Sequence, residues 1–268
     1  MTIAVGVACP EGLVLAADSR ASMFGEGYAR VATDFSHKVF DIGGRFGAVT
    51  FGWRFLETNT VAGVMEEFAA QTKLRDDVTD VAEKLRDYFR DRVQRHIKAG
   101  VDEAPPEGGD VLGFIVGGYD SKGIGHLKTV YLPSGDIIDG SSTAADGAGA
   151  HWQGDIEAIL RLMNGFDMIR TDVSAWPEEQ REALDRVAYL VPCYRMALQD
   201  AVDFACFVIR TTIDVQRFTD GTVAEPGGFA TCGGPIELLT ITGRGLAWLR
   251  RTTLTMASAA SETQGSPV

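Results

Sequence analysis

The second residue of the chain, Thr2, carries the groups needed for nucleophilic catalysis. It follows Met1 and opens an apolar run to Cys9, a pattern that predicts a buried strand beginning at Thr2. Removal of Met1 would leave a hydroxyl and a free α-amine on one residue. Such an amine has a pKa of about 7.7 to 8.0, so part of it is neutral near neutral pH and can accept the hydroxyl proton. Threonine is also a common second residue, so its position alone does not establish this chemistry.

Three further residues complete a candidate acyl-transfer site. The segment Leu13-Val14-Leu15-Ala16-Ala17-Asp18-Ser19-Arg20-Ala21-Ser22 is the most specific string in the chain. Together with Thr2 it resembles the proteasome β-subunit family of N-terminal nucleophile hydrolases, and within that family the bacterial ring proteases. Lys38, directly before Val39, and Gly52, directly after Phe51, are similar in placement to a lysine and a glycine of the same family.

The resemblance implies a role for each of these residues. Thr2 would attack a peptide carbonyl while its α-amine takes the proton. Lys38 would supply positive charge beside the hydroxyl, and Asp18 would keep that lysine charged and oriented. The Gly52 N–H would stabilise the oxyanion, an effect worth about 2.7 to 4 kcal/mol per donor. Single polar residues at strand ends usually just face water, so the hypothesis depends on the combination.

The resemblance also implies substrate contacts and an accessory network. We expect Arg20 and Ser22 to shape the site and pair with the substrate backbone, and Thr50 to form the floor of the pocket for a substrate side chain. Near the α-amine the family carries an accessory serine and an accessory aspartate. Ala148 and Phe229 stand where these are expected, and a further serine position is occupied by Cys232. Asp220 or Glu225 could replace the aspartate, and Cys232 could be a buried thiol or a catalytic one.

Three functions therefore remain open. The leading hypothesis is a threonine endopeptidase that assembles into a homo-oligomeric ring, acts on peptides or unfolded proteins, has an ATPase as a possible partner, and needs only removal of Met1 to mature. The second is an amidohydrolase of the same nucleophile class acting on a small-molecule amide. The third is a non-catalytic ring subunit, since a fold does not guarantee activity.

Composition excludes several other classes. The formal charge is −12, with 25 Lys and Arg against 37 Asp and Glu, which argues against a nucleic-acid surface. The four cysteines contain no CxxC pair, which favours free thiols in a reducing compartment. We find no signal sequence and no apolar run long enough to cross a membrane, and therefore expect a soluble, cytoplasmic protein. No motif indicates a cofactor or a metal.

The order of apolar patterns predicts an α+β fold, a four-layer αββα sandwich of two packed sheets flanked by helices. Residues 1–255 are expected to form a single domain and residues 256–268 a flexible tail. The polar stretch 22–36 is expected to be a loop. Strands are predicted at 3–9, 13–18, 38–42, 45–51, 111–118, 125–131, 135–139, 236–242 and 245–251, and helices at 57–72, 75–98, 152–164 and 192–218.

Overall fold

The apolar run at the N-terminus forms a hairpin at the centre of the first sheet. In the computed structural model, which describes residues 2–25, 27–71, 77–100, 109–144, 146–168, 170–223 and 225–253, every residue of β1 (Ile3–Cys9) and β2 (Gly12–Asp18) is buried. The antiparallel sheet has the order β12-β1-β2-β13-β14, with β12 at Gly149–Gly154, β13 at Ile236–Thr242 and β14 at Gly245–Arg250. Continuous apolar sequence in β1 and β2 thus corresponds to strands covered on both faces.

The second sheet, also five-stranded and antiparallel, has the order β11-β10-β9-β6-β5. Its strands are β5 (Val39–Ile42), β6 (Phe46–Gly52), β9 (Leu112–Tyr119), β10 (Gly125–Leu132) and β11 (Ile137–Ser142). Two short hairpins stand apart from the sheets: β3 (Ala21–Gly25) with β4 (Tyr28–Thr33), and β7 (Phe55–Leu56) with β8 (Asn59–Thr60).

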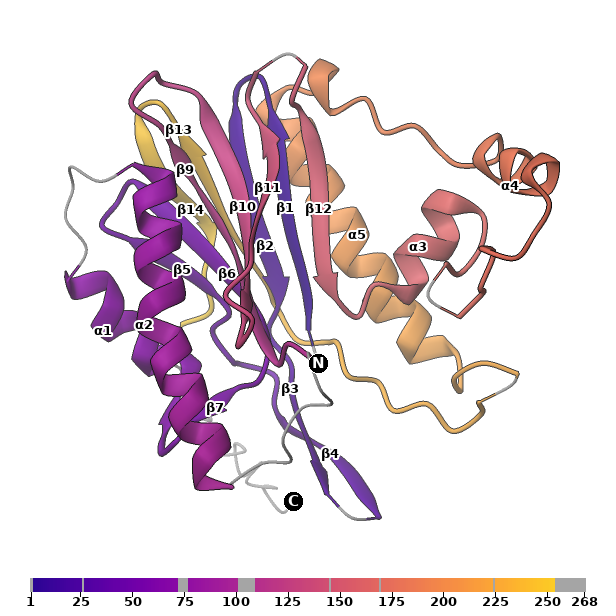
Figure 1. The fold of residues 1–268 in the computed structure, drawn as a ribbon, viewed down its shortest axis with the longest axis horizontal. Coiled ribbons are helices and arrows are strands. Elements are labelled where there is room, and N and C mark those ends of the chain that lie inside the picture. The colour runs from indigo at the N-terminus through magenta and orange to yellow at the C-terminus, as the bar shows by residue number, and fades with distance from the viewer. Residues whose placement is uncertain are drawn as a thin grey trace, which may run out of the picture.

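Helices cover the outer face of each sheet (Figure 1). The second sheet is covered by α1 (Val61–Gln71) and α2 (Val78–Ala99), and the first sheet by α3 (Glu157–Asn164) and α5 (Leu198–Phe218). A short helix α4 (Glu178–Asp185) and a 3₁₀ helix (Cys193–Arg195) lie between α3 and α5 in the chain. This arrangement is the predicted four-layer αββα sandwich, and the fold class is confirmed.

Small residues bring the two sheets close together. The cluster between the sheets contains Ala4, Ala8 and Ala17 of the central hairpin. A Cβ atom added to Gly6 would lie 3.1 Å from side-chain atoms of Ile115 and Leu127. The distance between the two sheets therefore depends on small side chains at these positions, and larger ones would not fit. This distance in turn sets the positions of residues at the strand ends.

Several boundaries differ from prediction, each for a local reason. The expected loop 22–36 overlaps the hairpin β3–β4, whose largely exposed residues, among them Met23, Phe24 and Tyr28, show no alternation of buried and exposed positions. The predicted helix at 152–164 is wrong in its first part, because Trp152 belongs to β12 and the helix begins at Glu157. The second helix begins at Val78, after Asp77 caps it by accepting bonds from the N–H groups of Thr79 and Asp80.

The other two predicted helices also begin later, and α4 was not predicted. The short hairpin β7–β8 occupies the residues before α1, and the 3₁₀ helix those before α5. The tail expected at 256–268 lies outside the described residues. Among the helices that the structure describes, none is long and apolar enough to span a membrane.

Candidate active site

Thr2 lies at the start of β1, where the backbone on both sides of it is held. The Thr2 carbonyl accepts a hydrogen bond from the N–H of Asp155 at 2.7 Å, and the next N–H, that of Ile3, donates to Oδ1 of Asp18 at 3.1 Å. The register of the β1–β2 hairpin, with Ala4 opposite Ala17, brings Ile3 and Asp18 to the same end of the two strands. Thr2 itself is 4% exposed.

The predicted pair of Lys38 and Asp18 forms at this strand end. The Lys38 Nζ lies 2.8 Å from Asp18 Oδ1, and both side chains are buried. The second oxygen, Oδ2, accepts from the N–H groups of Arg20 at 3.1 Å and Gly233 at 2.9 Å. Four donors thus surround one buried carboxylate, which meets the condition for keeping a charged pair inside a protein.

A second buried carboxylate, Glu237 on β13, fixes the backbone of Lys38. Its Oε2 accepts from the N–H of Lys38 at 3.1 Å and that of Val39 at 3.4 Å. Its Oε1 contacts Nδ1 of His37 at 2.7 Å and accepts from the N–H of Thr252 at 3.2 Å. Glu237 was not among the predicted site residues, although a lone acid in a strand predicted to be buried is a signal that could have identified it.

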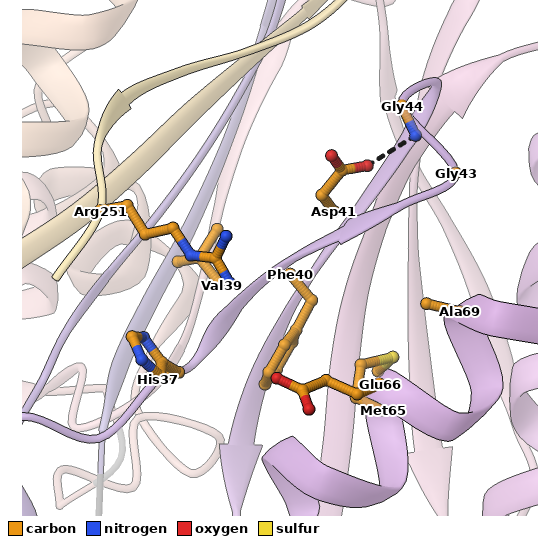
Figure 2. Close-up of a pocket in the computed structure, with 10 residues that line it drawn as sticks. All are labelled: His37, Val39, Phe40, Asp41, Gly43, Gly44, Met65, Glu66, Ala69 and Arg251. Atoms are coloured by element: carbon orange, nitrogen blue, oxygen red, sulfur yellow. Dashed lines mark hydrogen bonds between the residues drawn. The ribbon is translucent and has the colours of Figure 1, made fainter. Parts of the chain in front are cut away.

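His37 separates this region from a second cavity. His37 lines a cavity whose wall also contains Thr2. It also lines a second cavity, of about 300 Å³, whose wall includes Glu66 and Arg251 (Figure 2). The link from His37 to Glu237 therefore connects the backbone of Lys38 to the wall of this second cavity.

The N–H of Gly52 faces the edge of β6 on which Lys38 lies. The N–H of Thr50 donates to the Lys38 carbonyl at 2.9 Å, whereas the N–H of Trp53 donates to Val111 on the opposite side at 2.8 Å. Since N–H directions alternate along a strand, the N–H of Gly52 points to the same edge as that of Thr50, beyond the start of β5. Gly52 has φ +93°, and a Cβ there would lie 2.2 Å from the Val111 carbonyl oxygen.

One cavity of about 680 Å³ joins the predicted residues. Six of the seven line it: Thr2, Arg20, Ser22, Lys38, Thr50 and Gly52. The seventh, Asp18, is fully buried and bonded to Lys38.

The residues predicted for substrate contact are bonded within the protein. Arg20 pairs with Asp34 at 2.7 Å and donates to the Ala230 carbonyl at 3.2 Å. The Thr50 hydroxyl donates to the Gly113 carbonyl at 3.3 Å, and the Ser22 hydroxyl to the Thr231 carbonyl at 3.5 Å. These bonds hold the walls of the cavity, and contact with substrate by these residues remains a prediction.

The accessory positions differ from expectation. β12 runs antiparallel to β1 with Gly149 opposite Ala8, so Ala148 lies at the end of β1 far from Thr2 and is not the accessory position. Phe229 packs edge-on against Phe24, with ring centroids 6.0 Å apart. Of the acids considered in its place, Glu225 pairs with Arg170, and Asp220 is exposed.

Asp155, a residue that the sequence did not indicate, stands beside Thr2 instead. Its carboxylate accepts from the Thr231 hydroxyl, from Gln216 Nε2 at 3.3 Å and from Cys232 Sγ at 3.3 Å. Gln216 also accepts from the Cys232 N–H at 2.8 Å. The cluster joins the end of β12, helix α5 and the segment before β13 to the start of β1.

Cys232 is a buried thiol in this cluster. Burial raises its pKa well above the usual range, and the nearby carboxylates of Asp18 and Asp155 add to the effect. The thiol therefore stays protonated at neutral pH and acts as a donor to Asp155. Since only a thiolate is an effective nucleophile, Cys232 is not suited to that role. Cys232 was expected to be either a buried thiol or a catalytic one, and the geometry supports the buried thiol.

Metal ligation finds no support in the described residues, where no group of three or more His, Cys, Asp or Glu side chains is arranged to hold an ion. The chemistry that the site offers is that of a threonine hydroxyl, a lysine and backbone donors.

The chain has two sheets between helical layers, and a threonine starts a central strand beside a buried lysine and aspartate. This combination of fold and site is that of the N-terminal nucleophile hydrolases. A sequence model described as proteasome subunit matches residues 2–157, more than half of the chain, and the chain belongs to the proteasome subunit family. The matched region includes Thr2, Asp18, Lys38 and Gly52.

Among solved structures, an Anbu (Gly-1) mutant from Hyphomicrobium sp. strain MC1 is similar, with a TM-score of 0.52 and 19% identity over 93% of this chain and 86% of the other. At this identity the likeness concerns the fold alone. A search of curated proteins finds no match.

Proposed function

We propose that the chain is a threonine peptidase whose nucleophile is Thr2 after removal of Met1. One observation carries the proposal: Oδ1 of Asp18 bonds both to the N–H of Ile3, at 3.1 Å, and to Nζ of Lys38, at 2.8 Å. A single oxygen thereby ties the lysine to the residue that follows the nucleophile. A structural role alone gives no reason to bury a lysine in a cavity wall next to an N-terminal threonine.

The residues would act in sequence on a peptide bond. The Thr2 hydroxyl oxygen attacks the carbonyl carbon while its proton passes to the α-amine, and Lys38 favours the negative charge that develops on the oxygen. The N–H of Gly52 donates to the oxyanion. Collapse of this intermediate breaks the C–N bond, and the leaving amine takes the proton. Water then hydrolyses the ester on Thr2, with the α-amine as the base.

The Asp155 cluster would support the α-amine. The N–H of Asp155 donates to the Thr2 carbonyl, so Asp155 is in direct contact with the residue that carries the nucleophile. A carboxylate there favours the protonated amine that forms during attack. We include in the proposal that the peptidase works as a homo-oligomer enclosing its active sites, with peptides or unfolded proteins as substrates and an ATPase as a possible partner.

Intact-mass measurement tests the nucleophile directly. We expect the purified protein to lack Met1 and to form a single covalent adduct at Thr2 with an electrophile that bridges a hydroxyl and an adjacent amine. Native mass measurement of the same sample would give the number of subunits. A correctly trimmed protein that forms no adduct would contradict the mechanism.

Two substitutions separate the chemistry from the fold. Thr2→Ser keeps a hydroxyl and should retain part of the activity on unfolded protein and peptides, whereas Thr2→Ala should lose it. Activity unchanged in Thr2→Ala would point to a non-catalytic subunit and a contaminating peptidase. Hydrolysis of simple amides without any cleavage of peptides would favour the small-molecule amidohydrolase instead.

A further inference from the structure

The charges around the Thr2 cavity are strongly one-sided. Its described lining contains Arg20, Lys38, Arg54 and His37, and no aspartate or glutamate. The whole chain, in contrast, carries a net charge of −12. Asp18 and Glu237, which bond to Lys38 of this lining, are fully buried and are not among the residues that line the cavity.

The other basic side chains of the lining already have acidic partners within the protein. Lys38 pairs with Asp18, Arg20 pairs with Asp34, and His37 contacts Glu237. Because each of these side chains already contacts a carboxylate, it has little need of an anion in the cavity itself.

Arg54 is different. Within the described part of the chain, no carboxylate pairs with it, and its guanidinium lies over the ring of Phe55, with Cζ 5.0 Å from the centroid. Partial burial lowers the pKa of Arg54, and no neighbouring acid counteracts this effect. Removing a cation from water without a partner is unfavourable, so an unpaired arginine in a cavity wall indicates a ligand that supplies the missing charge.

We propose that Arg54 determines specificity by pairing with an acidic side chain, aspartate or glutamate, next to the cleaved bond of the substrate. The inference rests on the proposed peptidase function and names its substrate class. Five aromatic residues line the same cavity, Phe24, Phe35, Phe51, Trp53 and Phe55, and they suit apolar residues flanking the acidic one. A planar guanidinium can bind a carboxylate through two parallel hydrogen bonds, which gives direction as well as charge.

Peptides that differ only in charge test the proposal. We expect peptides with glutamate next to the cleaved bond to be cleaved with a kcat/KM roughly tenfold or more above that of the glutamine isosteres. Arg54→Gln should remove this difference mainly through a higher KM for the glutamate peptides. Arg54→Glu should shift the preference to lysine. Equal rates for glutamate and glutamine in the natural protein, or a preference unchanged in Arg54→Gln, would overturn the proposal.

Arg217 offers a matched control. Its Cζ also lies 5.0 Å from the ring of the next residue, Phe218, but on the exposed end of α5. Arg217→Gln removes the same charge and the same type of stacking, and should leave the preference intact. If instead Arg54→Gln changes only the subunit number seen by native mass measurement, the anion comes from a second copy of the chain and the proposal fails.

A binding measurement keeps this question separate from catalysis. With Thr2→Ala, fluorescence anisotropy compares labelled glutamate and glutamine peptide amides under conditions without turnover. Tighter binding of the glutamate peptide that disappears in Thr2→Ala/Arg54→Gln supports the role of Arg54, and equal binding refutes it. If the natural protein forms no adduct at Thr2 and cleaves no peptide, the proposed peptidase function is contradicted. If it cleaves peptides without a preference for acidic residues, only the role of Arg54 is contradicted.

Discussion

A single carboxylate, that of Asp18, serves both the chemistry and the fold at the residue scale. It holds Lys38 through its side chain and Ile3, Arg20 and Gly233 through their N–H groups. These donors come from β1, the end of β2, the approach to β5 and the segment before β13. Loss of this one group would therefore disturb four segments together, and activity alone cannot separate its two roles.

Replacing Lys38 tests the pair. Lys38→Met keeps much of the side-chain volume but leaves Asp18 as a buried charge without its partner. We expect peptidase activity to fall at least about a hundredfold and the free energy of unfolding to fall by about 3 to 5 kcal/mol. Activity assays and denaturant unfolding measure the two effects.

The double variant Asp18→Asn/Lys38→Met separates the two contributions. Removing both charges should recover much of the lost stability, since no unpaired ion remains, yet activity should stay as low as in Lys38→Met. A stable double variant with normal activity would show that Lys38 takes no part in catalysis.

At the scale of the elements, the backbone of Lys38 depends on β13. Glu237→Gln keeps the shape of the side chain but replaces an oxygen acceptor by an amide donor that faces other donors. We expect unfolding to become easier by about 1 to 3 kcal/mol, and kcat to fall more than KM changes, because Lys38 loses its position. Glu66→Gln is the control, since Glu66 lines the second cavity but has no bond to Lys38 among the described contacts. An unchanged kcat in Glu237→Gln would contradict the positioning role.

The turn at the end of β6 has no space for a side chain. Gly52→Ala would force a Cβ to within 2.2 Å of the Val111 carbonyl oxygen at φ +93°, so the strand end and its N–H must move. We expect loss of most activity, together with lower thermal stability. Gly123→Ala is the matched control, because Gly123 has φ +79° and a Cβ added there would meet nothing within 4 Å. Full activity in Gly52→Ala would argue against an oxyanion donor here.

The same elements show what sequence can and cannot predict. The central hairpin was predicted from a continuous apolar run. The assignment of Asp18, Lys38 and Gly52 to one site with Thr2 came from the family resemblance. Glu237 was missed because its bond to Lys38 spans 199 residues of sequence. β12 was mistaken for the start of a helix because an edge strand with half-buried residues on both faces shows no clear alternation.

At the scale of the whole molecule, the cluster between the sheets joins the two halves of the chain. Leu15 of β2, Ile115 of β9 and Leu239 of β13 belong to it together. We propose that residues 1–255 fold as one unit, and expect a chain that ends after residue 255 to unfold in a single transition at the temperature of the full chain. Calorimetry and circular dichroism on both chains measure this, and two separate transitions would contradict it.

The basic lining of the cavity, set in an acidic protein, affects how fast acidic substrates bind. An acidic peptide approaching from a distance meets the repulsive field of a protein with net charge −12, and encounters attraction only near the cavity wall. Added salt screens the distant repulsion more than the contact at a partly enclosed guanidinium. Moderate ionic strength should therefore speed the encounter with acidic peptides, the reverse of the slowing expected when charges of opposite sign attract over long range.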